Sequence, residues 1–305
     1  SADPTLARLA ENPHRAALDR NSVKLGRSDQ PIHSYLAQFR ACPALAPVLA
    51  AQRDALSAAL ADRPEGQLPV LSATAPFRTG GHAGPSAYTD IPAGTLEMRH
   101  VNDLYPFPNT LIGLKIDGAE VLDWLERAAS CFCQVLPHQR TQPLWDHAFA
   151  GHAFDTISGV TYRIDLTQPA RYDALGCLRD KTARRIQDLA WNGTSLAPEQ
   201  TFILATNSFR AFGGGPYRQT PEAQVIHKDE RQIKSLLTEY LRDKGITESH
   251  LQEFGNTWSF LPIDGASVVL ETGAGLRAYP RELHDLNAKD LGDAGEGFMR
   301  LELPL

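Results

Sequence analysis

The chain is organised around the stretch TNSFRAFGGGPY, residues 206–217. It follows an apolar run at residues 201–205 that has the composition of a buried strand. Within twelve residues the stretch holds an amide, a guanidinium, three aromatic rings and three glycines. Rings stack on flat ligands, and glycines let the backbone approach a ligand closely. The stretch therefore predicts a ligand-binding loop; the alternative is a glycine turn whose rings Phe209 and Phe212 belong to the core.

The composition limits the class of protein. The chain has 305 residues, of which 42% are hydrophobic and 22% charged, enough for one large globular domain or two small ones. A formal net charge of -6 argues against a surface that coats a nucleic-acid polymer, because such surfaces gather Lys and Arg. No apolar run reaches the roughly 18 residues that a membrane span needs. The chain starts at Ser1 without an initiator Met or a secretion signal, so we expect a processed or cut protein.

The order of the predicted elements favours an α+β fold. Pro43 opens a predicted helix at residues 44–62, whose leucines recur at three- and four-residue spacing. Because strands and helices alternate irregularly, a mixed sheet domain preceded by a long linker helix is favoured over a doubly wound sheet. Further helices are predicted at residues 119–132 and 229–244, and strands at residues 68–75, 110–116, 160–166, 184–191, 258–263, 267–271 and 298–303.

Two further loops carry polar side chains that could meet a ligand. Residues 76–84 form a glycine-rich loop in which Arg78 and His82 lie four residues apart. This pair predicts a grip on an anionic or hydroxyl-bearing ligand; the alternative is a solvated loop. Residues 104–109 include two prolines, which fix the backbone and present the amide of Asn109 rigidly.

Most catalytic and cofactor motifs are absent from the sequence. There is no His-Glu-x-x-His motif, and His147 and His152 are five residues apart across a glycine, which does not place them on one helix face. The four cysteines form no metal pattern, and no nucleophile elbow, phosphate loop or dinucleotide fingerprint occurs. We therefore expect no metal or other cofactor in this chain. The remaining rings, amides and cations suit recognition of a ligand better than bond cleavage.

Several stretches taken together resemble the C-terminal domain of the 5'-nucleotidase family. The subtype that the chain most resembles is the bifunctional 2',3'-cyclic-nucleotide 2'-phosphodiesterase/3'-nucleotidase, and the resemblance runs from about residue 23 to the end. The stretches that carry it lie at residues 70–81, 88–94, 103–110, 154–162, 169–173 and 205–215.

The resemblance implies a division of labour between two domains. In that family an N-terminal metallophosphoesterase domain holds a pair of divalent metals, and the C-terminal domain binds the nucleoside. The N-terminal metal motifs are absent here, so residues 1–63 would be the tail of that domain with the linker helix, and residues 64–305 the nucleoside-binding domain. The expected partners are nucleosides, nucleotides and the N-terminal domain, and the expected location is the periplasm. The chain alone would hydrolyse nothing; the alternative is a freestanding nucleoside-binding or interaction module without a catalytic role.

The resemblance also implies which residues bind the substrate. Two rings would sandwich the base, which contributes roughly 1–3 kcal/mol per base and discriminates little between bases. Such a domain would orient the phosphate towards metals held by its partner domain, with a hinge in the helix at residues 44–62. One ring would be Tyr217, with Phe212 as its rival, and the other His152 or Phe154; Arg78 and His82 would be the cations, Asn109 a presented amide, and Asn207 and Arg210 would either touch the ligand or brace the loop.

Overall fold

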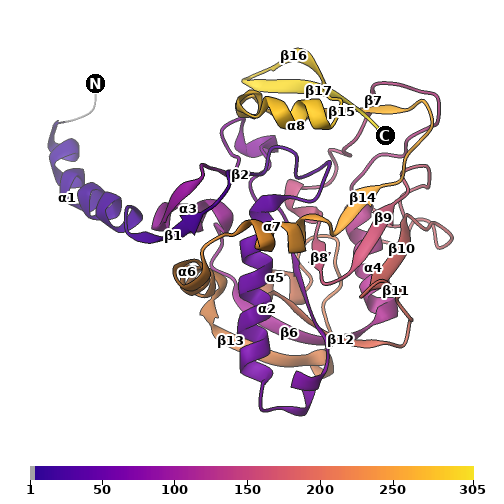
Figure 1. Ribbon diagram of the computed structural model, residues 1–305, viewed down its shortest axis with the longest axis horizontal. Coiled ribbons are helices and arrows are strands. Elements are labelled where there is room, and N and C mark those ends of the chain that lie inside the picture. The colour runs from indigo at the N-terminus through magenta and orange to yellow at the C-terminus, as the bar shows by residue number, and fades with distance from the viewer. Residues whose placement is uncertain (1–3) are drawn as a thin grey trace.

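The computed structural model describes residues 4–305, apart from the side chains of residues 4–10 and His82 and the solvent exposure of Gly255. Its largest sheet has five strands in the order β13-β6-β12-β3-β8 (Figure 1). Within this sheet β12 runs parallel to β3, while β6 and β8 run antiparallel to them. The strands are β3 (Val70–Thr74), β6 (Thr110–Asp117), β8 (Thr156–Ser158), β12 (Thr201–Asn207) and β13 (Val225–Gln232).

The residues of β12 alternate between two hydrophobic clusters, one on each face of this sheet. Phe202 and Leu204 join the cluster that contains α4 (Gly118–Ala129), and Ile203 joins the cluster that contains α2 (Ala46–Leu60). This period of two is what a strand buried on both faces requires. The predicted strand at residues 201–205 is confirmed, together with the α+β class of the fold.

The helix expected to link two domains, α2, lies against the central sheet (Figure 1). It contacts β3, β6 and β12, and its Leu49, Leu56 and Leu60 are at most 2% exposed. Gly113 in β6 makes room for it, because a Cβ there would lie 2.7 Å from Leu56 Cδ1. α2 is therefore part of the packed unit that follows it, and the division between residues 63 and 64 stays a prediction.

On the opposite face, α4 begins at a capping box. The side chain of Asp117 accepts from the Glu120 backbone N–H at 2.9 Å, and the Glu120 carboxylate accepts from the Asp117 N–H at 3.0 Å. Both bonds satisfy backbone donors that the first helical turn leaves free. The buried Val121, Trp124 and Leu125 then join the hydrophobic cluster on this face of the sheet.

Two smaller sheets and two ribbons complete the described chain. One sheet has the order β11-β10-β9-β14 and the other β16-β17-β15-β7, while β1 pairs with β5 and β2 with β4. The sequence did not predict β16, because its residues, KDLGDAG, do not alternate between apolar and polar. The bounds are β1 (Lys24–Ser28), β2 (Ile32–His33), β4 (Asp90–Ile91), β5 (Gly94–Glu97), β7 (Gln142–Pro143), β9 (Thr161–Ile164), β10 (Ile186–Trp191), β11 (Thr194–Ser195), β14 (Trp258–Phe260), β15 (Ser267–Gly273), β16 (Lys289–Gly295) and β17 (Phe298–Pro304).

The remaining helices lie around these sheets, and α1 extends away from the other elements (Figure 1). The predicted helix at 229–244 begins later, at Ile233, because residues 225–232 pair with β6 as β13. These helices are α1 (Pro4–Asn21), α3 (Met98–Leu104), α5 (Ser208–Ala211), α6 (Ile233–Lys244), α7 (Glu248–Gly255) and α8 (Pro280–Asp285), with short 3-10 turns η1 (Pro43–Leu45), η2 (Pro64–Gln67), η3 (Gly81–Ala83), η4 (Gly151–Ala153), η5 (Glu222–Gln224) and η6 (Ala274–Ala278).

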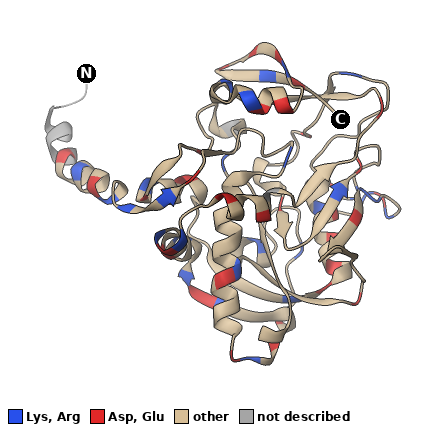
Figure 2. Cartoon of the chain, in the orientation of Figure 1, with Lys and Arg blue, Asp and Glu red and all other residues tan. Residues whose placement is uncertain are grey.

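Charged side chains are interspersed along these elements, with both signs represented on the same helices and strands (Figure 2). Among the helices that the structure describes, none combines the length and the apolar composition needed to cross a membrane.

Candidate functional site

Four loops meet at one edge of the central sheet. β3 and β12 are parallel and both end at this edge, while the antiparallel β6 and β8 begin there. The edge therefore collects the loops at residues 75–84, 104–109, 151–155 and 208–217. Every residue selected from the sequence lies on these loops or at the adjoining end of β12: Arg78, His82, Asn109, His152, Phe154, Asn207, Arg210, Phe212 and Tyr217.

An open hollow at this edge is lined by aromatic rings and glycine backbone. Its volume is about 520 Å³, and its walls come from Asn109, Ser208, Phe209, Phe212, Gly213 and Gly214. Phe209 and Phe212 are 47% and 45% exposed, so neither ring belongs to the core, which corrects the alternative drawn from the sequence. The backbone of Gly214 lies on the Phe209 ring, where a Cβ would come within 2.4 Å of ring carbons. A flat ligand could therefore stack on the uncovered part of this ring.

The amide of Asn109 forms part of the same wall. Its Nδ2 donates to the Tyr105 hydroxyl at 3.2 Å, and Tyr105 is fully buried. The neighbouring Thr110 N–H donates to Ser208 Oγ at 3.2 Å, which joins this loop to the start of α5. The Asn109 side chain is held in place by these contacts and is only partly buried. It keeps hydrogen-bonding capacity for the edge of a ligand.

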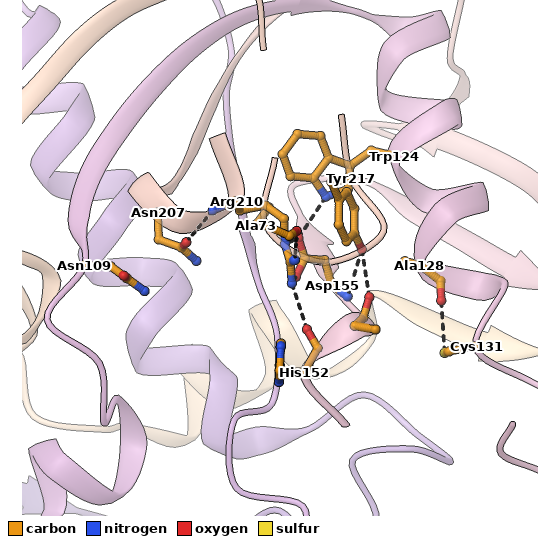
Figure 3. Close-up of polar contacts among 12 residues, drawn as sticks. Ala73, Asn109, Trp124, Ala128, Cys131, His152, Asp155, Asn207, Arg210 and Tyr217 are labelled. Carbon is orange, nitrogen blue, oxygen red and sulfur yellow. Dashed lines mark hydrogen bonds and ion pairs between the residues drawn. The ribbon is translucent and has the colours of Figure 1, made fainter. Parts of the chain in front are cut away.

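A buried ion pair joins Arg210, next to the residues that line the hollow, to Asp155 (Figure 3). The Asp155 carboxylate accepts from Arg210 Nε and Nη2, both at 2.8 Å, and from Trp124 Nε1 at 3.0 Å. Asp155 and Arg210 are each 1% exposed. Burial is the largest single influence and lowers the pKa of Arg210. The charge of Asp155, the hydrogen bond to it and the nearby Tyr217 and Tyr105 together outweigh burial, so the pKa is raised and the guanidinium stays charged.

Arg210 also connects two of the four loops. It donates to the backbone carbonyls of Gly214 and His152, the latter at 2.7 Å. Asn207 accepts from the Arg210 backbone N–H at 2.9 Å and so caps α5. Of the two roles that the sequence left open for Asn207 and Arg210, the structure shows both residues bracing the loop: both are at most 3% exposed and use their polar atoms internally.

Two of the rings expected to stack a ligand are core residues, which corrects the prediction for Tyr217 and Phe154. Tyr217 is 6% exposed, its ring lies beside Trp124 and under Arg210, and its hydroxyl donates to Ala153 O at 3.0 Å. Phe154 is 1% exposed and packs edge to face against neighbouring aromatic rings. Both are covered because the loop at residues 151–155 packs against the loop at residues 208–217, whose Arg210 and Tyr217 donate to its backbone carbonyls.

Of the two predicted cations, Arg78 and His82, the structure describes the side chain of Arg78. Arg78 is partly exposed; its Nη1 lies 3.4 Å from an Asp103 carboxylate oxygen, and its Nε donates to Tyr88 O at 3.3 Å. These contacts hold the guanidinium in place and already balance its charge in part. The side chain of His82 lies outside the described residues.

His152 faces the exposed rings. Its ring centroid is 6.2 Å from that of Phe209, and the two rings meet edge to face. Burial, and then the positive charge of Arg210, lower the pKa of His152 below its ordinary value, although Asp155 acts in the opposite direction. A lowered pKa keeps the imidazole neutral at neutral pH, which suits contact with an uncharged base.

This lowered pKa predicts a pH dependence. The unfolded chain binds a proton at His152 near pH about 6.5, whereas the folded chain binds it only at lower pH, so acidification through that window destabilises the fold. We expect the free energy of unfolding of wild type, minus that of a His152→Gln variant, to fall as the pH drops below about 6.5. Urea unfolding at a series of pH values measures this difference; a difference independent of pH would contradict the assignment.

The sequence reasoning did not select Phe209 and Phe107, two exposed rings at this edge of the sheet. Phe107 is 42% exposed at the same edge and packs edge to face on Phe77. Pro106 and Pro108 restrict the backbone around Phe107, but this restriction does not tell whether its ring is exposed. For Phe209 no sequence signal distinguishes it from Phe212 or Tyr217.

The described residues offer no metal site. Among them no three His, Cys, Asp or Glu side chains gather closely enough to hold a metal ion. A metal pair therefore does not fit the residues of this site, whose rings and amide suit an organic ligand.

Comparison with protein families gives one match over most of the chain. The model of the 5'-nucleotidase C-terminal domain matches residues 36–222. This range includes α2 and all four loops of the candidate site.

Curated relatives agree with this match. The 2',3'-cyclic-nucleotide 2'-phosphodiesterase/3'-nucleotidase of Salmonella typhimurium is 34% identical over 286 residues, which is 90% of this chain and 44% of that protein. Its Haemophilus influenzae namesake is 33% identical, covering 86% of this chain and 41% of that protein. The trifunctional nucleotide phosphoesterase protein YfkN of Bacillus subtilis is 31% identical over 94% of this chain but only 19% of its own length. The chain thus spans less than half the length of these relatives.

Solved structures share the fold. The 5'-nucleotidase precursor of Thermus thermophilus superimposes with a TM-score of 0.59 at 19% identity, over 86% of this chain and 44% of that chain. The NAD nucleotidase of Haemophilus influenzae gives a TM-score of 0.55 at 12% identity, over 85% of this chain and 42% of that chain.

Proposed function

This chain belongs to the family of 5'-nucleotidase C-terminal domains, and on that premise we propose that it is the nucleotide-recognition part of a 2',3'-cyclic-nucleotide 2'-phosphodiesterase/3'-nucleotidase. The observation that carries the proposal is the hollow at the sheet edge, where half-exposed rings stand over glycine backbone. Proteins seldom hold several exposed rings together without a ligand or partner for them.

The chemistry of the hollow suits a nucleoside. The base stacks on Phe209, whose other side rests on Gly214, and Phe212 or Phe107 supplies a further apolar contact. The Asn109 amide can bond to the edge of the base or to a ribose hydroxyl. Stacking accepts any base, so this arrangement favours broad specificity.

The phosphate has a different partner in this proposal. Arg78 is the partly exposed cation of the loop beside η4, and it would attract the phosphate without enclosing it. A pair of divalent metals in an N-terminal phosphoesterase domain would supply the charge and the activated water for hydrolysis. The present chain would contribute by orienting the scissile bond, and by itself it would leave nucleotides intact.

The compartment is also a proposal. The resemblance supports a periplasmic location, in which the enzyme would meet extracellular nucleotides. Fractionation of the host cells by osmotic shock tests this: we expect the protein in the released fraction, and recovery with the cytoplasmic markers would contradict it.

Calorimetric titration with adenosine and 3'-AMP tests the recognition role. We expect saturable binding by wild type, weakened in Phe209→Ala by roughly 5- to 150-fold, the equivalent of about 1–3 kcal/mol of stacking. Leu291→Ala, which removes a 39% exposed apolar side chain from β16, is the control and should bind like wild type.

The same titration separates the rings and can refute the proposal. Phe212→Ala should weaken binding less than Phe209→Ala, because Lys228 Nζ already lies over the Phe212 ring, 5.9 Å from its centroid. If wild type binds neither compound, or if Phe209→Ala binds as well as Leu291→Ala, the hollow is not the nucleoside site.

A further inference from the structure

We propose that Arg127 is a positioning residue for nucleotide recognition: it holds the end of the glycine loop, residues 213–217, against a neighbouring loop at residues 173–178. This inference rests on the proposed function, because it concerns the loop that supports Phe209. No sequence motif selects Arg127 for such a role, and it lies on α4, outside the four loops of the candidate site.

Arg127 bridges two carbonyls that are far apart in the sequence. Its Nη1 donates to Gly176 O at 3.1 Å and to Pro216 O at 3.0 Å, and its side chain is 3% exposed. Its Nε pairs with Asp123 Oδ2 at 2.9 Å, and its Cζ lies 3.9 Å from the centroid of the Tyr172 ring. Asp123 in turn accepts from the Tyr172 hydroxyl. The guanidinium therefore has a fixed orientation before any ligand binds.

The glycine loop depends on such side-chain contacts. The backbone N–H groups of Gly213 and Gly214 donate to Arg210 O and Phe209 O, and a turn follows at residues 215–216. Two buried guanidinium groups bind carbonyls of this segment from outside it, since Arg210 bonds to Gly214 O and Arg127 to Pro216 O. Hydrogen bonds from a charged donor are about twice as strong as neutral ones, and they are stronger still where water is excluded.

The loop at residues 173–178 and the end of the glycine loop are in close contact at Gly176. A Cβ at this position would lie 2.4 Å from Pro216 O, and the backbone has φ +76°, which side-chain-bearing residues rarely adopt. The loop that carries it is itself rigid, because Asp173 Oδ1 accepts from the N–H groups of Leu175 and Cys177 at 3.0 and 2.9 Å. The glycine loop thus packs against a second loop that has its own hydrogen bonds, and Arg127 stabilises the contact by donating to a carbonyl of each loop.

Lysine cannot replace arginine in this role. The planar guanidinium directs the two N–H groups of Nη1 to two carbonyls while Nε pairs with the Asp123 carboxylate. The ammonium group of lysine is a compact charge without this fixed geometry. Arg127→Lys should keep the charge but release one of the loops. Gly176→Ala should open the same contact from the other side, without changing any charged group.

Arg185 provides a matched control. It is a buried arginine that also bonds to backbone carbonyls, of Ala129 at 2.8 Å, Phe132 at 2.7 Å and Gln168 at 3.0 Å, none of which belongs to the glycine loop. Arg185→Lys should therefore lower the stability as Arg127→Lys does, but leave the glycine loop in place.

The experiment combines adenosine titration, thermal unfolding and amide hydrogen exchange for wild type and the three variants. Arg127→Lys and Gly176→Ala should weaken binding by about tenfold, a free-energy change equivalent to one lost bond from a charged group. They should also speed exchange in residues 213–217. Arg185→Lys should lower the unfolding temperature while the dissociation constant and this exchange remain as in wild type.

The outcomes distinguish this inference from the proposed function. Unchanged exchange in residues 213–217 of both Arg127→Lys and Gly176→Ala overturns the inference, as does equal weakening of binding by Arg185→Lys. If wild type does not bind adenosine, the proposed function fails, and the exchange measurement alone then decides the inference. Phe209→Ala should show the reverse pattern, with lost binding and wild-type exchange, because it removes the ring and leaves the loop.

Discussion

Replacing Asp155 with alanine is expected to lower the free energy of unfolding by about 3–5 kcal/mol, because it leaves the guanidinium of Arg210 buried without a counter-charge. The carboxylate is 1% exposed and is the acceptor for both Arg210 and Trp124. Urea unfolding of the variant and of wild type measures the loss. Because Arg210 also holds the carbonyls of Gly214 and His152, adenosine binding should be lost with it.

A second Arg–Asp pair is the control. Arg163 and Asp188 are 49% and 59% exposed, so their ion pair is screened by water. Asp188 has a φ of 51°, which Asn tolerates better than Ala, so Asp188→Asn removes the charge without straining the backbone. Asp188→Asn should cost less than about 1 kcal/mol. If Asp155→Ala and Asp188→Asn proved equally mild, Asp155 would not carry the tertiary role assigned to it.

Replacing Phe154 with alanine is also expected to cost about 3–5 kcal/mol of stability, because it opens a cavity in the aromatic core. Its ring centroid lies 4.9 Å from that of Phe132 and 5.0 Å from that of Trp258. By contrast, Phe209→Ala should lower the stability by less than about 1 kcal/mol, since surface changes seldom cost more.

Comparing Phe154→Ala with Phe209→Ala separates a ring that stabilises the core from a ring that binds the ligand. Phe154→Ala should lose stability, and adenosine binding by its folded fraction should persist; Phe209→Ala should lose binding and keep its stability. Unfolding in urea and calorimetric titration read out the two properties separately. Loss of binding without loss of stability in Phe154→Ala would restore the assignment made from the sequence, with Phe154 as a ligand-stacking ring.

Much of the architecture could be predicted from local patterns. The apolar run at residues 201–205 became β12, and the leucine spacing after Pro43 became α2. Periodicity works for such elements because each buries a continuous face. It failed at residues 229–232, the last part of a charged edge strand, which were predicted as the start of a helix, and at β16, because neither strand is buried in an alternating pattern.

The candidate site was located by sequence at the level of loops but not of rings. The four loops and the end of β12 carry all nine selected residues, and the family match covers the same stretches. Within the loop at residues 208–217, however, Tyr217 was selected and is 6% exposed, whereas Phe209 was not selected and is 47% exposed. Loops have no repeating geometry, so spacing along the chain does not tell which side chain turns inward.

The sequence by itself determined the fold class and the family, and it indicated the loops of the candidate site. Those properties follow from strand and helix periodicity and from short motifs, which are local in the chain. Only the tertiary structure decided which rings meet solvent and which residues brace the loops. Arg210 and Asp155 are 55 residues apart, and Arg127 and Pro216 are 89 apart. Such contacts depend on which distant segments the fold brings together. A buried charge must pair with a group that lies next to it in space, whatever the distance between the two along the sequence.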